Sequence, residues 1–142
     1  MPGSSLNLDR FLEAQALVYV QVVRELTAAR KTSHWMWFIF PQLKGLGRTS
    51  TAQFYGIESK AKALAYWKHA VLGARLKECA ELVLAAPSGL TAHDVVGSPD
   101  ELKMRSCMTL FAAVAPDEAC FREVLQRFYS GKLDEATLQM LL

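Results

Sequence analysis

Hydrophobic residues recur every three or four positions along most of the chain, a spacing typical of amphipathic helices. The first such stretch covers residues 7–30, and Asn7 or Asp9 is available to cap its start. A second stretch covers residues 60–86, after Ser59. Within it we expect a break in the helix near residues 69–73.

Cap residues divide the second half of the chain into shorter helices. Thr91 precedes a short helix. Ser98 with Pro99, and a capping box closed by Glu101, precede a helix that we expect to end at about Val114. Pro116 with Asp117 begins the next helix, and Asp134 begins the last one. No segment combines period-two alternation with β-branched residues and hairpin turns. We therefore predict an all-α fold, a compact multi-helix bundle with a single domain over residues 7–142 and a flexible tail over residues 1–6.

Length and composition fit one globular domain. The chain has 142 residues, of which 51% are hydrophobic and 21% charged. It lacks an apolar run of about 20 residues and a signal peptide, so we expect a cytoplasmic protein without a membrane partner. The three cysteines are far apart in sequence and predict buried thiols, and the three histidines lack metal-ligand spacing, so no metal site is expected.

An aromatic-rich connection separates the first two helical regions. Residues 31–49 include the stretch SHWMWFIFPQ at residues 33–42, in which a helical turn ended by Pro41 is compatible with the sequence. A connection of this length without regular structure is uncommon in a compact domain and is often functional. The aromatic stretch is thus the first place to look for a binding site.

Polar groups suited to ligand contacts surround this aromatic stretch. His34 is our candidate general acid or base if the protein is an enzyme, because imidazole is the side chain that most often has this role, although no reaction class is indicated. Arg48 offers a planar donor fork for carboxylate or phosphate. Gln15 occupies a core-facing helix position, and a polar stripe accompanies the hydrophobic face of the helix after residue 98. The candidate ligand-binding residues are Gln15, Lys31, Ser33, Trp35, Trp37, Gln42, Arg48, Lys103, Ser106 and Thr109.

These residues favour a pocket for a small anionic or nucleotide-like ligand. One alternative is a protein-interaction module that uses the aromatic stretch as an exposed hot spot, and another is a purely structural loop without a ligand. Nucleic-acid binding is unlikely at a net charge of +2 and without a recognised motif. Cofactor and oligomeric state stay open.

Several motifs, read together, resemble a known family. They are RFLEAQ, KTSHWMWFIFPQLKGLG, AQFYGI, AYWKHAVLGARL, DELKMRSCMTLFAAVAP and LDEATLQMLL, and they span nearly the whole chain. The chain thereby resembles DUF1810, a mainly bacterial domain family of unknown function whose members are often labelled calpastatin. The resemblance implies an all-helical single domain and no established activity. It adds Tyr55 to the candidate ligand-binding residues.

Overall fold

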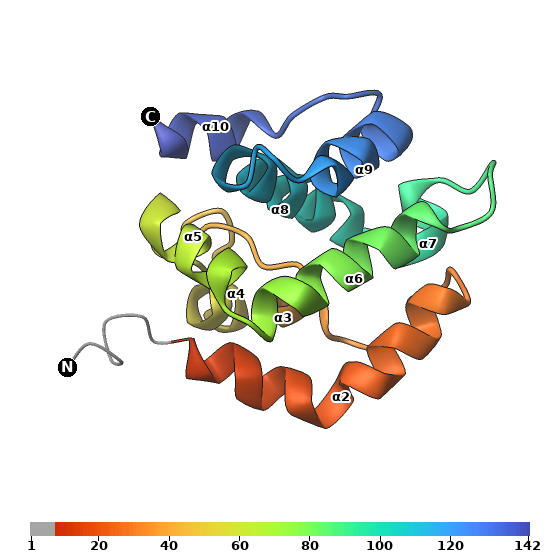
Figure 1. Cartoon of the computed structure of the whole chain (residues 1–142), viewed down its shortest axis with the longest axis horizontal. Helices are drawn as coiled ribbons and strands as arrows, with labels where there is room; N and C mark the ends of the chain where they lie inside the picture. Colours follow the sequence, from red (N-terminus) through yellow and green to blue (C-terminus); the bar gives the residue numbers. More distant parts are fainter. Residues whose placement is uncertain (1–7) are drawn as a thin grey trace.

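The structure is a computed structural model that describes residues 8–142, and its helices pack in several directions around a shared core (Figure 1). The helices are α2 (Asp9–Thr27), α3 (Met36–Ile39), α4 (Ser50–Tyr55), α5 (Lys60–Lys68), α6 (Leu72–Leu84), α7 (Ala92–Val96), α8 (Asp100–Val114), α9 (Ala119–Tyr129) and α10 (Glu135–Leu141). The predicted all-α fold is confirmed. The predicted flexible tail, residues 1–6, lies outside the described residues.

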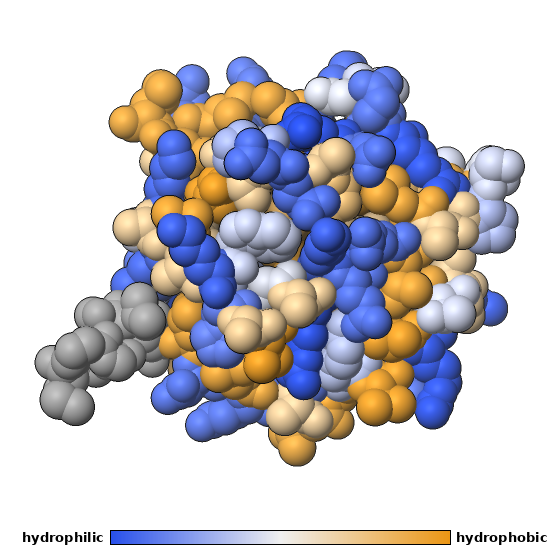
Figure 2. Space-filling model, viewed as in Figure 1, coloured by the Kyte–Doolittle hydropathy of each residue, from blue (hydrophilic) through white to orange (hydrophobic). Residues whose placement is uncertain are grey.

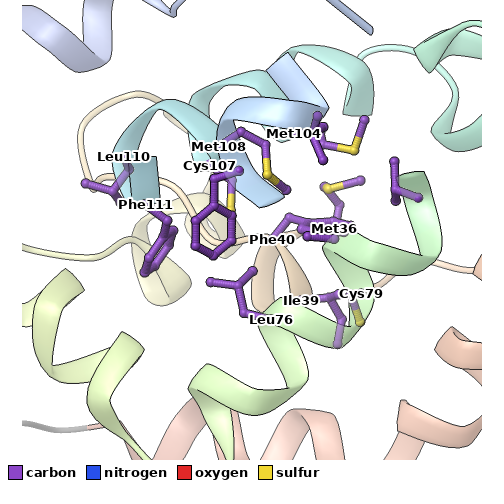
Figure 3. Packing of buried hydrophobic residues seen from close by; sticks show 14 of the residues in the cluster. Met36, Ile39, Phe40, Leu76, Cys79, Met104, Cys107, Met108, Leu110 and Phe111 are labelled. Carbon is purple, nitrogen blue, oxygen red and sulfur yellow. The ribbon is translucent and has the colours of Figure 1, made fainter. Parts of the chain in front are cut away.

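The core forms where α6 and α8 meet the short helix α3. Helix α6 packs against α2, α5 and α9, while α8 packs against α5, α7, α9 and α10. Figure 3 shows Met36 and Phe40 from the aromatic stretch facing Cys107 and Met108 of α8, with Cys79 of α6 nearby. Each large apolar side chain buried here stabilises the fold by about 1.5–3 kcal/mol relative to an exposed one.

Most of the aromatic stretch belongs to this core. Trp35, Met36, Ile39 and Phe40 are each at most 2% exposed, whereas Trp37 remains partly exposed. The expected helical turn is α3, which ends directly before Phe40 and Pro41. The predicted loop therefore contains one short helix, and its apolar side chains mostly face inward.

Three helix caps agree with the sequence signals. The Ser59 hydroxyl accepts a hydrogen bond from the Lys62 amide at 3.2 Å, and the Asp134 carboxylate accepts one from the Thr137 amide at 3.0 Å. Thr91 caps α7 in a reciprocal capping box with Asp94. Each cap satisfies an amide that the helix itself leaves without an acceptor.

Three other cap predictions were wrong. Residue Leu8 precedes α2, so Asp9 is the first helical residue rather than the cap, while Asn7 lies outside the described residues. Pro99 occupies the cap position of α8, and no side chain caps that helix, so the capping box from Ser98 to Glu101 does not form. Glu118 rather than Pro116 with Asp117 caps α9, through a hydrogen bond from Cys120.

The expected break between α5 and α6 is confirmed. The His69 ring nitrogen Nδ1 accepts hydrogen bonds from the amides of Val71 at 3.1 Å and Leu72 at 3.3 Å, so it satisfies the start of α6. Gly73 then approaches the preceding helix so closely that an added Cβ would lie 2.0 Å from the Trp67 carbonyl oxygen. Only glycine fits this contact between the two helices.

Backbone hydrogen bonds fasten the connection between α2 and α4 to the bundle. The Lys31 amide donates to the Val95 carbonyl at 2.7 Å. Farther along, Leu43 and Ile57 form an isolated parallel bridge, with the Lys44 amide donating to the Ile57 carbonyl at 2.8 Å. The connection is thus held at both ends, which fixes the path of its backbone across the bundle.

Hydrophobic and hydrophilic areas interleave across the face seen in Figure 2, with an orange area along the lower edge where α2 lies. Helix α2 exposes Leu17 and Val20, which are 86% and 72% accessible. In the described part of the chain, no helix is long and apolar enough to cross a membrane.

Candidate functional site

Two adjoining hollows lie beside the aromatic connection. The first has a volume of about 380 Å³, and its lining includes Trp37, Gln42, Arg48, Lys103, Ser106 and Asp134. The second has a volume of about 400 Å³, and its lining includes Lys31, Ser33, His34, Trp37, Asp100 and Lys103. Trp37, Pro99 and Lys103 line both hollows, and we call this shared boundary the ridge. Each hollow is large enough for part of a small molecule.

The fold brings most of the predicted site residues to these hollows. Lys31, Ser33, His34, Trp37, Gln42, Arg48, Lys103 and Ser106 all line one or both of them. They come from the connection between α2 and α4 and from the first two turns of α8. Segments from opposite halves of the chain therefore meet here, although the role of these side chains in ligand binding stays a prediction.

Two of the remaining candidates, Gln15 and Trp35, make hydrogen bonds on the buried side of the connection. The Gln15 side-chain amide donates to the Phe38 carbonyl at 2.7 Å and to the Tyr66 hydroxyl at 3.0 Å, so Gln15 joins α2 to α3. The Trp35 indole N–H donates to the Glu25 carboxylate at 3.0 Å, and its ring is buried. Neither side chain lines either hollow.

Tyr55 and Thr109 also lie away from both hollows. The Tyr55 ring packs against the rings of Phe11, Phe38 and Phe54. The buried Thr109 hydroxyl donates to the Arg105 carbonyl at 2.8 Å and accepts from the Asp134 amide at 2.9 Å. These contacts stabilise the fold around the site.

Asp100 pairs with two lysines at the ridge. The Lys31 ammonium lies 2.7 Å from one carboxylate oxygen of Asp100, and the Lys103 ammonium lies 3.4 Å from the other. Lys103 also lies over the Trp37 ring, 5.5 Å from its centre, as expected of a cation–π contact. Two positive charges thus share one negative charge, so Lys31, Lys103 and Asp100 together leave a net positive charge at the ridge.

Arg48 adds a further cation to the first hollow. Its side chain is exposed and makes no hydrogen bond or ion pair with any residue between 8 and 142. The neighbouring Asp134 does not neutralise it, because that carboxylate pairs with Arg105 at 3.5 Å and caps α10. The guanidinium of Arg48 is therefore available for an anionic group.

A buried carboxylate organises the start of the connection. Glu25 is 4% exposed and accepts hydrogen bonds from the amides of Thr32 and Ser33, the Ser33 hydroxyl, the Trp35 indole and the Gln21 side chain. Burial alone would raise its pKa, but these hydrogen bonds, led by that of Ser33, hold the pKa well below its ordinary value. Glu25 therefore remains ionised inside the protein.

The cysteine thiols are poorly suited to nucleophilic chemistry. Burial raises the pKa of Cys79 and of Cys120 to about 12, and it raises the pKa of Cys107 as well. Ser106 lines the first hollow, but its hydroxyl donates to the Leu102 carbonyl at 3.1 Å. Across residues 8–142, no three His, Cys, Asp or Glu side chains are grouped to hold a metal ion. None of these thiols is therefore activated as a nucleophile in this structure.

Sequence reasoning overlooked Glu25 and Asp100. Glu25 follows Phe11, Gln15 and Val22 on the buried stripe of α2, so a charged residue at a core-facing position was a usable signal. Asp100 carried no comparable signal, because acidic residues are ordinary in the first turn of a helix. Its pairing with Lys31 depends on the tertiary fold.

Comparisons with known proteins agree with the sequence motifs. A comparison with curated protein sequences found no match. A crystal structure of the conserved hypothetical protein Rv1873 from Mycobacterium tuberculosis is similar to this chain, with a TM-score of 0.94 and 46% sequence identity, covering 96% of this chain and 97% of that chain. A family model described as a protein of unknown function (DUF1810) matches residues 5–141. The chain therefore belongs to the DUF1810 family.

Proposed function

We propose that the protein binds a small anionic or nucleotide-like ligand in the two hollows on either side of Trp37. The observation that carries this proposal is the meeting of Arg48, Lys31 and Lys103 beside an accessible aromatic ring. Cations supply attraction for phosphate or carboxylate, and an indole face supplies a flat apolar surface for a base or sugar.

Surrounding polar groups would orient such a ligand. His34 is exposed in the second hollow and makes no hydrogen bond with any residue of the described chain, so both ring nitrogens are available. Gln42 presents a side-chain amide to the first hollow. If a reaction occurs, His34 is the group we assign as general acid or base.

The interaction-module alternative receives less support. It requires an exposed hydrophobic patch, whereas Trp35, Met36, Ile39 and Phe40 are buried in the core. A hot spot built on Trp37 alone would be small for a stable protein interface. The burial of these four side chains therefore argues against an exposed docking patch.

A thermal-shift screen tests the proposed ligand class. The probes are inorganic phosphate, pyrophosphate, AMP, ADP, ADP-ribose, a sugar phosphate and citrate, each with the wild type, His34→Ala and Arg48→Ala. A probe present at about one hundred times its Kd adds about 2.7 kcal/mol of stability. We expect at least one anionic probe to raise the melting temperature of the wild type and to lose most of this effect in both variants.

Two control variants separate site effects from general charge effects. His93→Ala removes an exposed histidine and Lys68→Ala an exposed cation, and neither residue lines either hollow. Both controls should keep the wild-type shift. No shift with any probe, or an equal loss in the controls, would remove the ligand proposal and favour a structural role for the connection.

A further inference from the structure

We propose, building on the ligand site proposed above, that Glu25 is its positioning residue. The buried carboxylate fixes the backbone of residues 32–35 and thereby sets the direction of His34 and Trp37 at the hollows. Glu25 itself lines neither hollow, so it acts through the segment that it holds.

The two carboxylate oxygens divide the donors between them. Oε1 accepts from the amides of Thr32 at 2.7 Å and Ser33 at 3.0 Å and from the Trp35 indole at 3.0 Å. Oε2 accepts from the Ser33 hydroxyl at 2.5 Å and the Gln21 side chain at 2.8 Å. Five donors thus converge on one side chain, which fully occupies its accepting capacity of about four lone pairs.

This convergence determines the path of the chain. A carboxylate buried at 4% exposure is unfavourable unless it is fully hydrogen bonded, so the low-energy state requires all these donors to point at Glu25. The Glu25 carbonyl also accepts from the Arg30 amide at 2.9 Å, which closes the turn after α2. One residue therefore defines both the end of the helix and the start of the connection.

The constraint extends from Glu25 to the ridge. His34 lies between Ser33, whose amide and hydroxyl donate to Glu25, and Trp35, whose indole N–H donates to it, so the segment is restrained on both sides of His34. The Lys31 ammonium lies 5.1 Å from the centre of the Trp35 ring and pairs with Asp100. A contact pathway therefore runs from α2 to the first turn of α8. Such a supporting layer reduces the ordering that a ligand must impose on the site.

The substitution Glu25→Gln tests this positioning role, because it keeps the shape of the side chain and removes its charge. Without any ligand, NMR hydrogen exchange of the Trp35 indole N–H and of the Thr32 and Ser33 amides reports directly on the segment. We expect these protons to exchange about tenfold faster or more in the variant, because hydrogen bonds to a charged acceptor are the stronger ones. The NMR signals of His34 and Trp37 should shift as well.

Val124→Ala is the matched control, since it creates a cavity in α9 without touching the connection. It should lower the melting temperature and leave the exchange of the three protons locally unchanged. Wild-type protection of these protons in Glu25→Gln would overturn the positioning role. This readout needs no ligand, so it decides the role of Glu25 even if no probe binds.

Affinity measurements then connect the segment to the site. With whichever of pyrophosphate or AMP shifts the wild type, Glu25→Gln should weaken binding by about tenfold, while Val124→Ala should bind as the wild type does. Faster exchange of these three protons together with unchanged affinity would show that the site does not depend on Glu25 and would overturn the inference. Absence of binding to the wild type would count against the proposed function alone.

Discussion

Asp100 determines how much positive charge the ridge presents. Its carboxylate contacts both Lys31 and Lys103, and an incoming anion must compete with it for the same ammonium groups. A charge held so close to a candidate anion site limits affinity and also selects against weakly charged ligands. This balance can be altered by changing one side chain.

The substitution Asp100→Asn should therefore strengthen anion binding. Removing the carboxylate charge releases the ammonium groups of two lysines, and we expect about two- to fivefold tighter binding of pyrophosphate by calorimetry. Glu101→Gln is the control, because it removes the same charge from the adjacent position, which lines neither hollow. Equal or weaker binding by Asp100→Asn would count against the ridge as the anion site.

The two tryptophans of the aromatic stretch show how far residue-level prediction can go. Residues two positions apart point to nearly opposite sides of a helical turn, so helix geometry predicts that only one of Trp35 and Trp37 faces the core. Which of them does so depends on where α8 and Glu25 lie, and the local sequence does not contain that information. The sequence thus identified the aromatic stretch as a candidate site, but it did not show which of its side chains are buried and which are accessible.

At the scale of elements, helix ends were predictable where a cap acts locally. Ser59, Thr91 and Asp134 bind amides within their own helix, so their roles can be recognised from neighbouring residues. At α8 the local signal failed, because Pro99 itself occupies the cap position and the expected box cannot form. Local chemistry identified the order of the longer helices better than it identified their first residues.

The break between α5 and α6 is the element boundary most sensitive to a single methyl group. Gly73→Ala would place a Cβ 2.0 Å from the Trp67 carbonyl oxygen, which belongs to the backbone and cannot rotate away. We expect a loss of about 3 kcal/mol in the free energy of unfolding, measured by urea denaturation.

Gly89→Ala provides the comparison for this substitution. Gly89 has a φ of +97°, but an added Cβ would meet nothing within 4 Å. Its replacement should cost only the backbone strain, about 1 kcal/mol. A Gly73→Ala variant as stable as Gly89→Ala would show that α5 and α6 can separate without penalty.

At the scale of the whole molecule, several carboxyl groups are stabilised in their ionised form. Hydrogen bonds from Thr91 lower the pKa of Asp94. For Glu25, Glu118 and Asp134, burial acts in the opposite direction, yet hydrogen bonds leave each pKa below its ordinary value, aided by Lys77 at Glu118 and by Arg105 at Asp134. Glu25 and Asp94 lie in α2 and α7, and Glu118 and Asp134 cap the starts of α9 and α10, so acid should weaken the bundle throughout.

The sign of this pH dependence follows from the lowered pKa values. The ionised carboxylates contribute their full stabilisation above the ordinary carboxyl pKa near 4. This contribution decreases as the pH falls below that value toward the lower pKa values that the groups have in the folded protein. We expect the free energy of unfolding to fall between about pH 5 and pH 3, as measured by urea titration, and to fall less in Glu25→Gln. A constant or rising stability over this interval would contradict the assignment.

The pairing of Lys31 with Asp100 also bears on how the protein acquires its site during folding. One partner precedes the aromatic stretch and the other begins α8, so the pair is separated by the whole of α3, α4, α5, α6 and α7. Contacts between such distant segments form late, because closing the intervening loop costs conformational entropy. The ridge is consequently a property of the native state alone, and a folding intermediate with only local helices would lack it.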